Sequence, residues 1–182
     1  MAGMLFTKTK IPGVTVIELE LRHDERGFFA RQWCAEELAR AGLDPRVTQI
    51  NLARSTAAGT LRGVHYQMAP HAEVKLVRCT RGVVFDVALD LRPSSPTFRD
   101  WFGVELDAES GRMLYVPEGC AHGYLTLVPD CDLVYQASVT YAPKSARGVR
   151  FDDPAFAIAW PAPIRVISEQ DRSWPSFSST AA

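Results

Sequence analysis

The sequence predicts an all-β fold, a barrel or a sandwich, with one short helix near the N-terminus. Strand-like apolar runs follow one another closely, turn-forming residues separate them, and only one stretch has the composition of a helix. Nine such runs occupy residues 47–53, 59–67, 74–80, 82–91, 101–107, 112–117, 123–128, 132–141 and 147–151. Prolines and glycines between the runs predict turns, for example at residues 93–96 and 117–119.

The N-terminal part contributes further elements. Residues 13–21 alternate apolar and polar side chains, which is the period of a half-buried strand. After a charged turn, residues 28–33 could resume as a strand. Residues 35–41 consist of good helix formers, and Gly42 and Pro45 end this helix.

Length and composition indicate one compact domain over residues 1–182. A chain of 182 residues with 47% hydrophobic residues can bury a substantial core. We find no internal repeat and no linker that would divide the chain. The tail, residues 161–182, is rich in proline and serine without an amphipathic period, so we expect it to lie along the surface or to be partly disordered.

Charge and cysteine usage exclude several classes of function. Lys and Arg number 20 against 21 Asp and Glu, so no overall basic excess favours nucleic acid. The four cysteines form no C-x-x-C pair, which fits a reducing compartment. No apolar run approaches the ~18 residues of a membrane span, and the N-terminus has no signal-peptide pattern. We expect a soluble, cytoplasmic protein without nucleic-acid or membrane partners.

Residues 59–67 hold the first candidate site residues. Arg62 and His65 lie among apolar residues, which indicates a buried strand and not a loop. Alternation along a regular strand would put Arg62 and His65 on opposite faces. Either a bulge at Gly63 re-aims one of them, or the two side chains serve different parts of one long ligand.

Residues 117–122 hold the second candidate site. They fit a P-x-G-x-x-H turn that is typical of cupin barrels, and they end at His122. Metal-binding cupins carry H-x-H followed by Glu in the first part of their signature, where this chain has His65, Tyr66 and Gln67, with Glu73 further on. This is a poor ligand set for a first-row metal, so we expect no metal site.

Longer motifs give a closer resemblance. The segments DERGFF, TLRGVHYQ, KLVRCTRGVVFDVALDLRPSSPTF, LYVPEGCAHGY and VYQASVTYAP occur in one order at compatible spacing. Together they resemble the nucleotide-sugar 3,5-epimerases, in particular the dTDP-4-dehydrorhamnose 3,5-epimerase family, from about residue 13 to residue 171. The resemblance implies a dimeric cupin jelly roll that needs no metal or cofactor. It also implies an isomerase of deoxysugar biosynthesis, a route to cell-surface polysaccharides.

The resemblance assigns catalytic roles to four residues. In a 4-keto sugar, C3 and C5 both lie next to the carbonyl, so removing either proton gives an enolate that can be reprotonated from the other face. His65 matches the family's base, and Asp171 matches the carboxylate that orients the imidazole. Tyr135 matches the acid on the opposite face, and Lys75 the cation beside the oxyanion.

The resemblance also suggests residues that bind the substrate. Arg62 offers a guanidinium fork for the diphosphate. Arg26 matches an arginine that reaches the site of the partner subunit, so a homodimer is expected. Gln49 and Asn51 match polar residues at the nucleotide end of the site.

Three further residues are expected near the sugar. Tyr141, six residues after Tyr135 on the same expected strand, would form a wall of the sugar pocket. Asp86, in an apolar strand, needs a partner, for which we expect Lys75 or His65. His122 either contacts the site directly or only packs near it.

The sequence departs from the family pattern at several positions. Ala30 and Arg31 follow RGFF, whereas the family usually has one residue and then a Glu at this place. Glu73 stands where Gln is common in the family. These departures leave the nucleotide base and the sugar open, and epimerisation at C3 alone or C5 alone remains possible. A 3,4-ketoisomerase, a metal-dependent cupin enzyme and a non-catalytic sugar-binding cupin are the alternatives. Tyr135 and Asp171 argue against the ketoisomerase.

Overall fold

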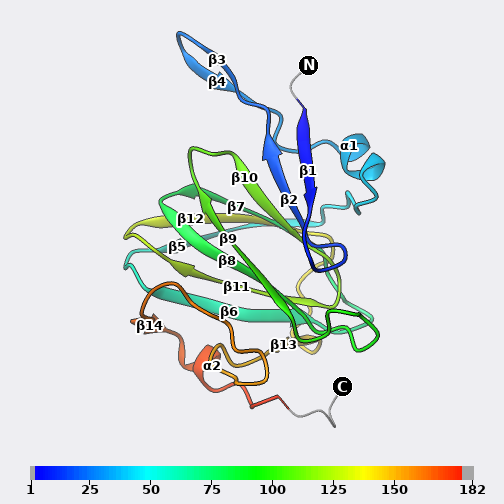
Figure 1. The fold of residues 1–182 in the computed structure, drawn as a ribbon, viewed down its shortest axis with the longest axis vertical. Coiled ribbons are helices and arrows are strands. Elements are labelled where there is room, and N and C mark those ends of the chain that lie inside the picture. The colour runs from blue at the N-terminus through cyan, green and yellow to red at the C-terminus, as the bar shows by residue number, and fades with distance from the viewer. Residues whose placement is uncertain (1–2, 178–182) are drawn as a thin grey trace.

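Two antiparallel β-sheets packed face to face form the body of the protein (Figure 1). The structure, a computed structural model, describes residues 3–177. The first sheet has the order β1 (Met4–Lys8), β2 (Thr15–Leu19), β10 (Arg112–Val116), β7 (Lys75–Arg81), β12 (Cys131–Ala137) and β5 (Gln49–Ser55). The second has the order β13 (Ala146–Gly148), β6 (Thr60–Gln67), β11 (Cys120–Thr126), β8 (Val83–Asp90) and β9 (Trp101–Asp107).

The predicted all-β sandwich is confirmed, and each of the nine expected runs overlaps one strand. Several elements differ from the expectation. β1 was not anticipated, the strand expected over residues 28–33 is the short β4 (Gly27–Phe29), and β12 ends at Ala137 instead of continuing to Tyr141. Helix α1 (Ala35–Arg40) lies where the sequence predicts it.

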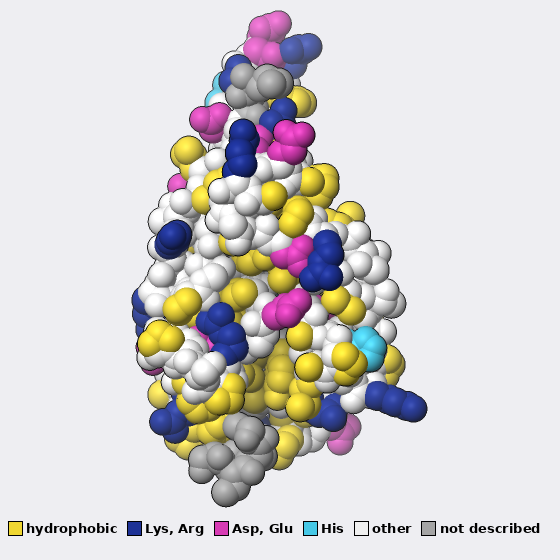
Figure 2. Space-filling view, turned by 90° about the vertical axis from the view of Figure 1, so that its right-hand side faces the viewer, with side chains coloured by type: hydrophobic (Ala, Val, Ile, Leu, Met, Phe, Trp, Pro, Cys, Tyr) yellow, Lys and Arg dark blue, Asp and Glu magenta, His cyan; other side chains and the backbone are white. Residues whose placement is uncertain are grey.

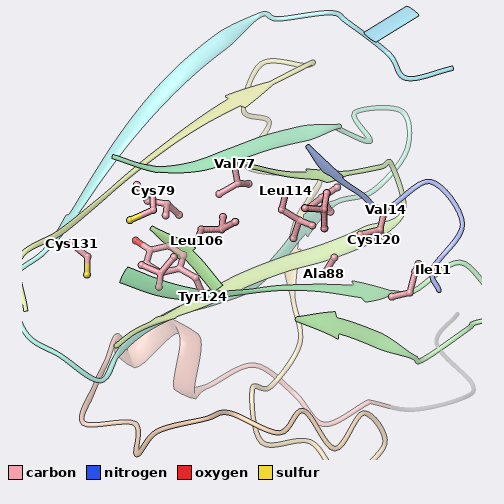
Figure 3. Packing of buried hydrophobic residues seen from close by; sticks show 14 residues of the cluster. Ile11, Val14, Val77, Cys79, Ala88, Leu106, Leu114, Cys120, Tyr124 and Cys131 are labelled. Atoms are coloured by element: carbon pink, nitrogen blue, oxygen red, sulfur yellow. The ribbon is translucent and has the colours of Figure 1, made fainter. Parts of the chain in front are cut away.

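The core fills the space between the two sheets, as Figure 3 shows. Side chains alternate across the first sheet, so that Val16 and Leu114 point into this core. Their neighbours Ile17 and Met113 point outward and pack against Leu38 of α1. Both faces of the first sheet are therefore buried near α1, which explains why β10 reads as a nearly continuous apolar run.

The C-terminal part of the chain covers the outer face of the second sheet. Val64 of β6 and Leu89 of β8 pack there against Val149 and Phe156. The tail also forms β14 (Val166–Ile167), which pairs in parallel with β6, and α2 (Glu169–Arg172). The expectation that the tail lies along the surface is confirmed for residues 161–177, which add the short elements β14 and α2. Residues 178–182 lie outside the described part.

The hairpin of β3 (Arg22–Asp24) and β4 projects away from the sandwich (Figure 1). It carries Phe28 and Phe29, of which Phe29 is 69% exposed. Figure 2 shows charged side chains of both signs at the narrow end of the molecule, with acidic and basic side chains side by side over the face in view. Neither helix within residues 3–177 is long and apolar enough to cross a membrane.

A bulge in β6 at Gly63 distinguishes this strand from its neighbours. His65 pairs with His122 and Arg62 with Tyr124, so two residues of β6 stand opposite the single residue Gly123. Gly63 has a φ of +131°, and a Cβ placed on it would lie 2.5 Å from the Cα of Gly123. Only glycine fits at this point of the strand.

We expect Gly63→Ala to destabilise the fold more than Gly27→Ala. Gly27 is the matched control because its φ is +126° and a Cβ on it would meet nothing within 4 Å. The control costs about 1 kcal/mol of backbone strain. Gly63→Ala adds the overlap with β11 and loses roughly 2 kcal/mol more. Urea unfolding of both variants measures this difference, and equal losses would contradict the close approach at Gly63.

Candidate active site

A cavity of about 570 Å³ opens between the two sheets and the C-terminal segment. Strands β6 and β11 of the second sheet and β5, β7 and β12 of the first contribute to its walls, and residues 166–171 close one side. The lining consists of Ala53, Thr60, Leu61, Arg62, His65, Lys75, His122, Tyr124, Tyr135, Val166, Ile167, Ser168, Gln170 and Asp171. All four residues predicted to be catalytic lie in this lining.

His65 and Asp171 form a hydrogen-bonded pair. Nε2 of His65 lies 2.5 Å from Oδ1 of Asp171, and the other carboxylate oxygen accepts the backbone N–H of Gly63 at 3.3 Å. Burial alone would raise the pKa of Asp171, but the hydrogen bond and charge of His65, together with the Gly63 amide, hold this pKa below its usual range. The carboxylate accepts Nε2–H, which leaves Nδ1 of His65 free to act as a base.

The bulge at Gly63 places Arg62 and His65 on the same cavity, although they are three residues apart. The first of the two explanations offered for these residues is therefore confirmed. Arg62 is held by two bonds, from Nε to Oγ of Ser55 at 3.2 Å and from Nη2 to the carbonyl oxygen of Arg54 at 2.9 Å. Nη1 of Arg62 takes part in neither bond, so a ligand in the cavity can bind it.

Tyr135 and Lys75 enter the cavity from the first sheet. Tyr135 comes from β12 and Lys75 from the start of β7, so both reach the cavity from the sheet that faces His65. Burial raises the pKa of Tyr135, the charge of Glu73 raises it further, and Arg62 opposes this rise. Tyr135 is therefore a protonated phenol at neutral pH and can donate a proton.

A second His–Asp pair lies beside the first. Nε2 of His122 is 2.8 Å from Oδ1 of Asp86, and both side chains are buried. The expectation that Lys75 or His65 partners Asp86 is wrong. Asp86 stands opposite Tyr124 in the β8–β11 ladder, so His122, two residues along β11, is its diagonal neighbour on the same face.

Two of the predicted nucleotide-binding residues lie on β5, next to the cavity but outside its lining. Gln49 and Asn51 share a face with Ala53, which does line the cavity. Asn51 pairs with Tyr135 in the ladder, and its Oδ1 accepts a hydrogen bond from Nε2 of Gln49 at 3.2 Å. The two amides therefore extend the inner face of β5 beyond the cavity.

Tyr141, Arg26 and Arg31 lie away from the cavity. The expectation that Tyr141 shares a strand face with Tyr135 is wrong, because Tyr141 follows the end of β12 and is exposed. Arg26 stands at the tip of the β3–β4 hairpin, where it pairs with Asp24. Arg31 pairs with Glu37 of α1.

Several lining residues were not predicted from the sequence. Tyr124 could have been found, because it lies two residues after His122 on β11 and therefore shares its face. Ser168 and Gln170 belong to the tail, where no periodicity signals their position. Ser168 also caps α2, since its Oγ accepts the backbone N–H of Asp171 at 3.0 Å.

The donor set does not fit a metal ion. Within residues 3–177, no group of three or more His, Cys, Asp or Glu side chains is arranged to hold one. His65 and His122 each direct Nε2 at a carboxylate of their own, Asp171 and Asp86. Neither Nε2 is therefore free to bind a metal ion.

Comparisons with known proteins give a consistent result. A family model described as dTDP-4-dehydrorhamnose 3,5-epimerase matches residues 8–179. The dTDP-4-dehydrorhamnose 3,5-epimerase of Shigella flexneri is 42% identical over 171 residues, which cover 93% of this chain and 94% of the relative. The dTDP-4-dehydrorhamnose 3-epimerase of Streptomyces niveus is 40% identical, with 89% of this chain and 78% of the relative covered.

Solved structures are similar over the same length. The crystal structure of dTDP-4-dehydrorhamnose 3,5-epimerase from Bacillus anthracis, with TDP and PPi bound, matches with a TM-score of 0.93 at 36% identity. The match covers 96% of this chain and all of that one. The likeness therefore includes the whole sandwich and the segment that carries Asp171.

We expect Asp171→Asn to change how stability depends on pH. A carboxyl whose pKa is lowered by folding stabilises the protein above its ordinary pKa of 3.8, and this contribution is lost as the pH falls through the lower, folded-state value. The wild type should therefore lose stability more steeply than Asp171→Asn between about pH 5 and about pH 3. Urea unfolding followed by tryptophan fluorescence at each pH measures the two slopes.

The control for this measurement is Asp100→Asn, which removes an exposed aspartate outside the cavity. It should follow the wild-type slope more closely than Asp171→Asn does. Identical slopes for the wild type and Asp171→Asn would contradict the stabilising pair of Asp171 with His65.

Proposed function

Because the chain belongs to the dTDP-4-dehydrorhamnose 3,5-epimerase family, we propose that it epimerises a dTDP-linked 4-keto-6-deoxyhexose at C3 and C5. The proposed substrate is dTDP-4-dehydro-6-deoxyglucose, and the reaction belongs to deoxysugar biosynthesis. The protein is an isomerase, because the reaction moves protons and leaves the connectivity of the heavy atoms unchanged.

One observation carries this proposal: His65 and Tyr135 line the same cavity from opposite sheets. His65 projects from β6 of the second sheet, whereas Tyr135 projects from β12 of the first. A sugar ring placed between the sheets therefore presents one face to Nδ1 of His65 and the other to the phenol of Tyr135. Inversion at a carbon requires removal of the proton from one face and delivery to the other.

Lys75 supplies the third group that the reaction needs. Its ammonium group is held at the cavity wall by a hydrogen bond of 3.3 Å to the carbonyl oxygen of His65. When His65 removes a proton from C3 or C5, negative charge develops on the carbonyl oxygen O4. An ammonium positioned beforehand beside O4 stabilises this enolate, with no reorganisation of water at that moment.

Exchange with water restores the protonation states of His65 and Tyr135 after each epimerisation. His65 gains the proton that leaves carbon, and Tyr135 loses the proton that carbon receives. His65 has a side chain that is 42% exposed, so both groups can return to their starting states by exchange through the cavity. The same two groups then serve the second carbon, because both C3 and C5 are adjacent to the carbonyl.

The diphosphate of the substrate is proposed to bind at Arg62. This guanidinium stands at the cavity wall, and a guanidinium forms charge-assisted bonds with phosphate oxygens. The relative from Bacillus anthracis holds TDP and PPi. Gln49 and Asn51, which lie along β5 from the cavity, would face the nucleoside.

We also propose a homodimer in which Arg26 reaches the site of the partner. The β3–β4 hairpin projects from the body, so Arg26 cannot serve the cavity of its own chain without a large movement (Figure 1). Apolar side chains are exposed on the hairpin and on the edge strand β5, where Ile50 is 62% and Leu52 69% exposed. A subunit interface would bury these side chains.

The cytoplasm is the proposed location of the enzyme. Cys79, Cys120 and Cys131 are buried free thiols, and Cys34 is free as well. Unpaired cysteines are typical of proteins in reducing compartments.

Exchange of carbon-bound protons tests the proposed mechanism. In deuterated water, the wild type should incorporate deuterium at C3 and at C5 of dTDP-4-dehydro-6-deoxyglucose, as followed by proton NMR. His65→Ala should lower both exchange rates by at least about 100-fold, because the base serves both carbons. Tyr135→Phe should still exchange protons but invert poorly, because the enolate is then reprotonated from the original face.

His71→Ala is the control, because His71 is an exposed histidine outside the cavity lining. It should exchange at the wild-type rate. Normal inversion by Tyr135→Phe would reject Tyr135 as the proton donor. Exchange at C3 alone by the wild type would assign the activity of a 3-epimerase, which is the function of the Streptomyces niveus relative.

Mixing two inactive variants tests the role of Arg26 across the interface. Arg26→Ala and His65→Ala should each be nearly inactive alone. Mixed and allowed to exchange subunits, they form dimers in which one site combines an intact His65 with an intact Arg26 from the partner. About a quarter of all sites should recover activity.

The matched control mixes Arg26→Ala with the double variant Arg26→Ala/His65→Ala, which offers no Arg26 to any site and should recover nothing. Light scattering first establishes whether the wild type is a dimer. A monomeric wild type, or a mixture without recovery, would refute the shared site.

A further inference from the structure

A carboxylate that the proposed mechanism does not use stands behind Lys75. Oε1 of Glu73 lies 3.1 Å from Nζ of Lys75, and each of the two side chains is only 11% exposed. Lys75 lines the cavity, whereas Glu73 does not. The substrate would therefore meet the ammonium group but not the carboxylate.

The backbone around Glu73 is fixed to the strand that carries Tyr135. Val74 donates its N–H to Oγ of Ser138 at 2.8 Å and accepts the N–H of Ser138 at 3.1 Å. Lys75 continues this pairing opposite Ala137, at the end of β12. The pairing between β7 and β12 thus holds Glu73 beside Lys75, and Glu73 does not lie in a flexible loop.

The ion pair explains how a charged lysine persists at this place. An ammonium group that is mostly removed from water loses hydration, and a carboxylate at 3.1 Å offsets this cost. Only the ammonium form of Lys75 stabilises an enolate at O4. The same carboxylate acts on the acid, because its negative charge opposes ionisation of Tyr135.

Several other charged or titratable groups surround Tyr135 and Lys75. Arg62 and His65 face them from β6, and His122 and Tyr124 face them from β11. Asp171 faces them from α2. Of these, Arg62 favours ionisation of Tyr135, so Glu73 and Arg62 act on the phenol in opposite directions.

We propose that Glu73 is a positioning residue, which holds the Lys75 ammonium at the sugar carbonyl. The inference rests on the epimerase function proposed above. The charge of Glu73 also opposes ionisation of Tyr135, so the acceptor and the charge of this one side chain can be tested separately.

Two substitutions separate these roles. Glu73→Gln keeps an oxygen that accepts a hydrogen bond from Lys75 but removes the charge, so the maximal kcat should stay within about threefold of the wild type. In the plot of kcat against pH, the alkaline limb of Glu73→Gln should lie at lower pH than that of the wild type. Without the charge of Glu73, Tyr135 ionises more easily. Glu73→Ala removes the acceptor as well and should lower kcat roughly 10- to 100-fold with little change in KM.

Glu37→Gln is the matched control. Glu37 is also a mostly buried carboxylate, with a side chain that is 10% exposed, in an ion pair with Arg31 of its own chain, but it lies outside the cavity. This variant should leave both kcat and the alkaline limb unchanged. A general loss of stability would affect both variants alike, whereas the proposed role affects Glu73→Gln alone.

A titration without substrate tests Glu73 independently of the enzymatic activity. Tyrosine ionisation, followed by ultraviolet difference absorbance, should begin at lower pH in Glu73→Gln than in the wild type. This shift should vanish when Tyr135→Phe is present in both proteins. A wild type without proton exchange at C3 or C5 overturns the proposed function, and the titration still decides whether Glu73 acts on Tyr135. The role of Glu73 is overturned if three results are unchanged from the wild type: the titration of Glu73→Gln, its alkaline limb, and the kcat of Glu73→Ala.

Discussion

The cavity depends on one carboxylate that joins two distant parts of the chain. Asp171, in the tail, bonds both the imidazole of His65 and the backbone N–H of Gly63. A buried carboxylate without such partners would be costly, so the pair holds the tail and the bulge of β6 together. The bulge brings Arg62 to the same side as His65, and the tail closes the wall beside them. The proposed base, the proposed phosphate contact and the shape of the cavity are therefore coupled through Asp171.

The sandwich itself accounts for the opposed placement of the proposed base and acid. Inward-facing side chains of the two sheets point toward one another, so His65 on β6 and Tyr135 on β12 would approach a sugar ring from its two faces. Core residues such as Val77 and Leu133 lie on the same inner faces of β7 and β12 and keep these strands rigid. A site on packed strands holds its geometry better than one on loops.

Local patterns in the sequence predict local structure well and long-range contacts poorly. The strand runs and the helix at 35–41 follow from alternation and propensity alone, whereas the bulge at Gly63 was one of two explanations that the sequence left open. The partner of Asp86 does not follow, because it depends on the register between β8 and β11. The path of the tail depends on the pairing of β14 with β6, which no local pattern signals. The roles of Tyr135 and Lys75 came from the family resemblance, since a tyrosine or a lysine on a strand is in itself unremarkable.

The two His–Asp pairs differ in the surroundings of the imidazole and not in its partner, and this difference supports the choice of His65 as the proposed base. His65 and His122 stand opposite each other in the β6–β11 ladder, and each directs Nε2 at a carboxylate. The side chain of His65 is 42% exposed and that of His122 only 8%. An imidazole that has taken a proton from carbon must release it to water, and a buried imidazole cannot exchange readily with water. His122 is therefore suited to shape the cavity wall beside Asp86, while His65, at the open side of the bulge, is suited to carry protons.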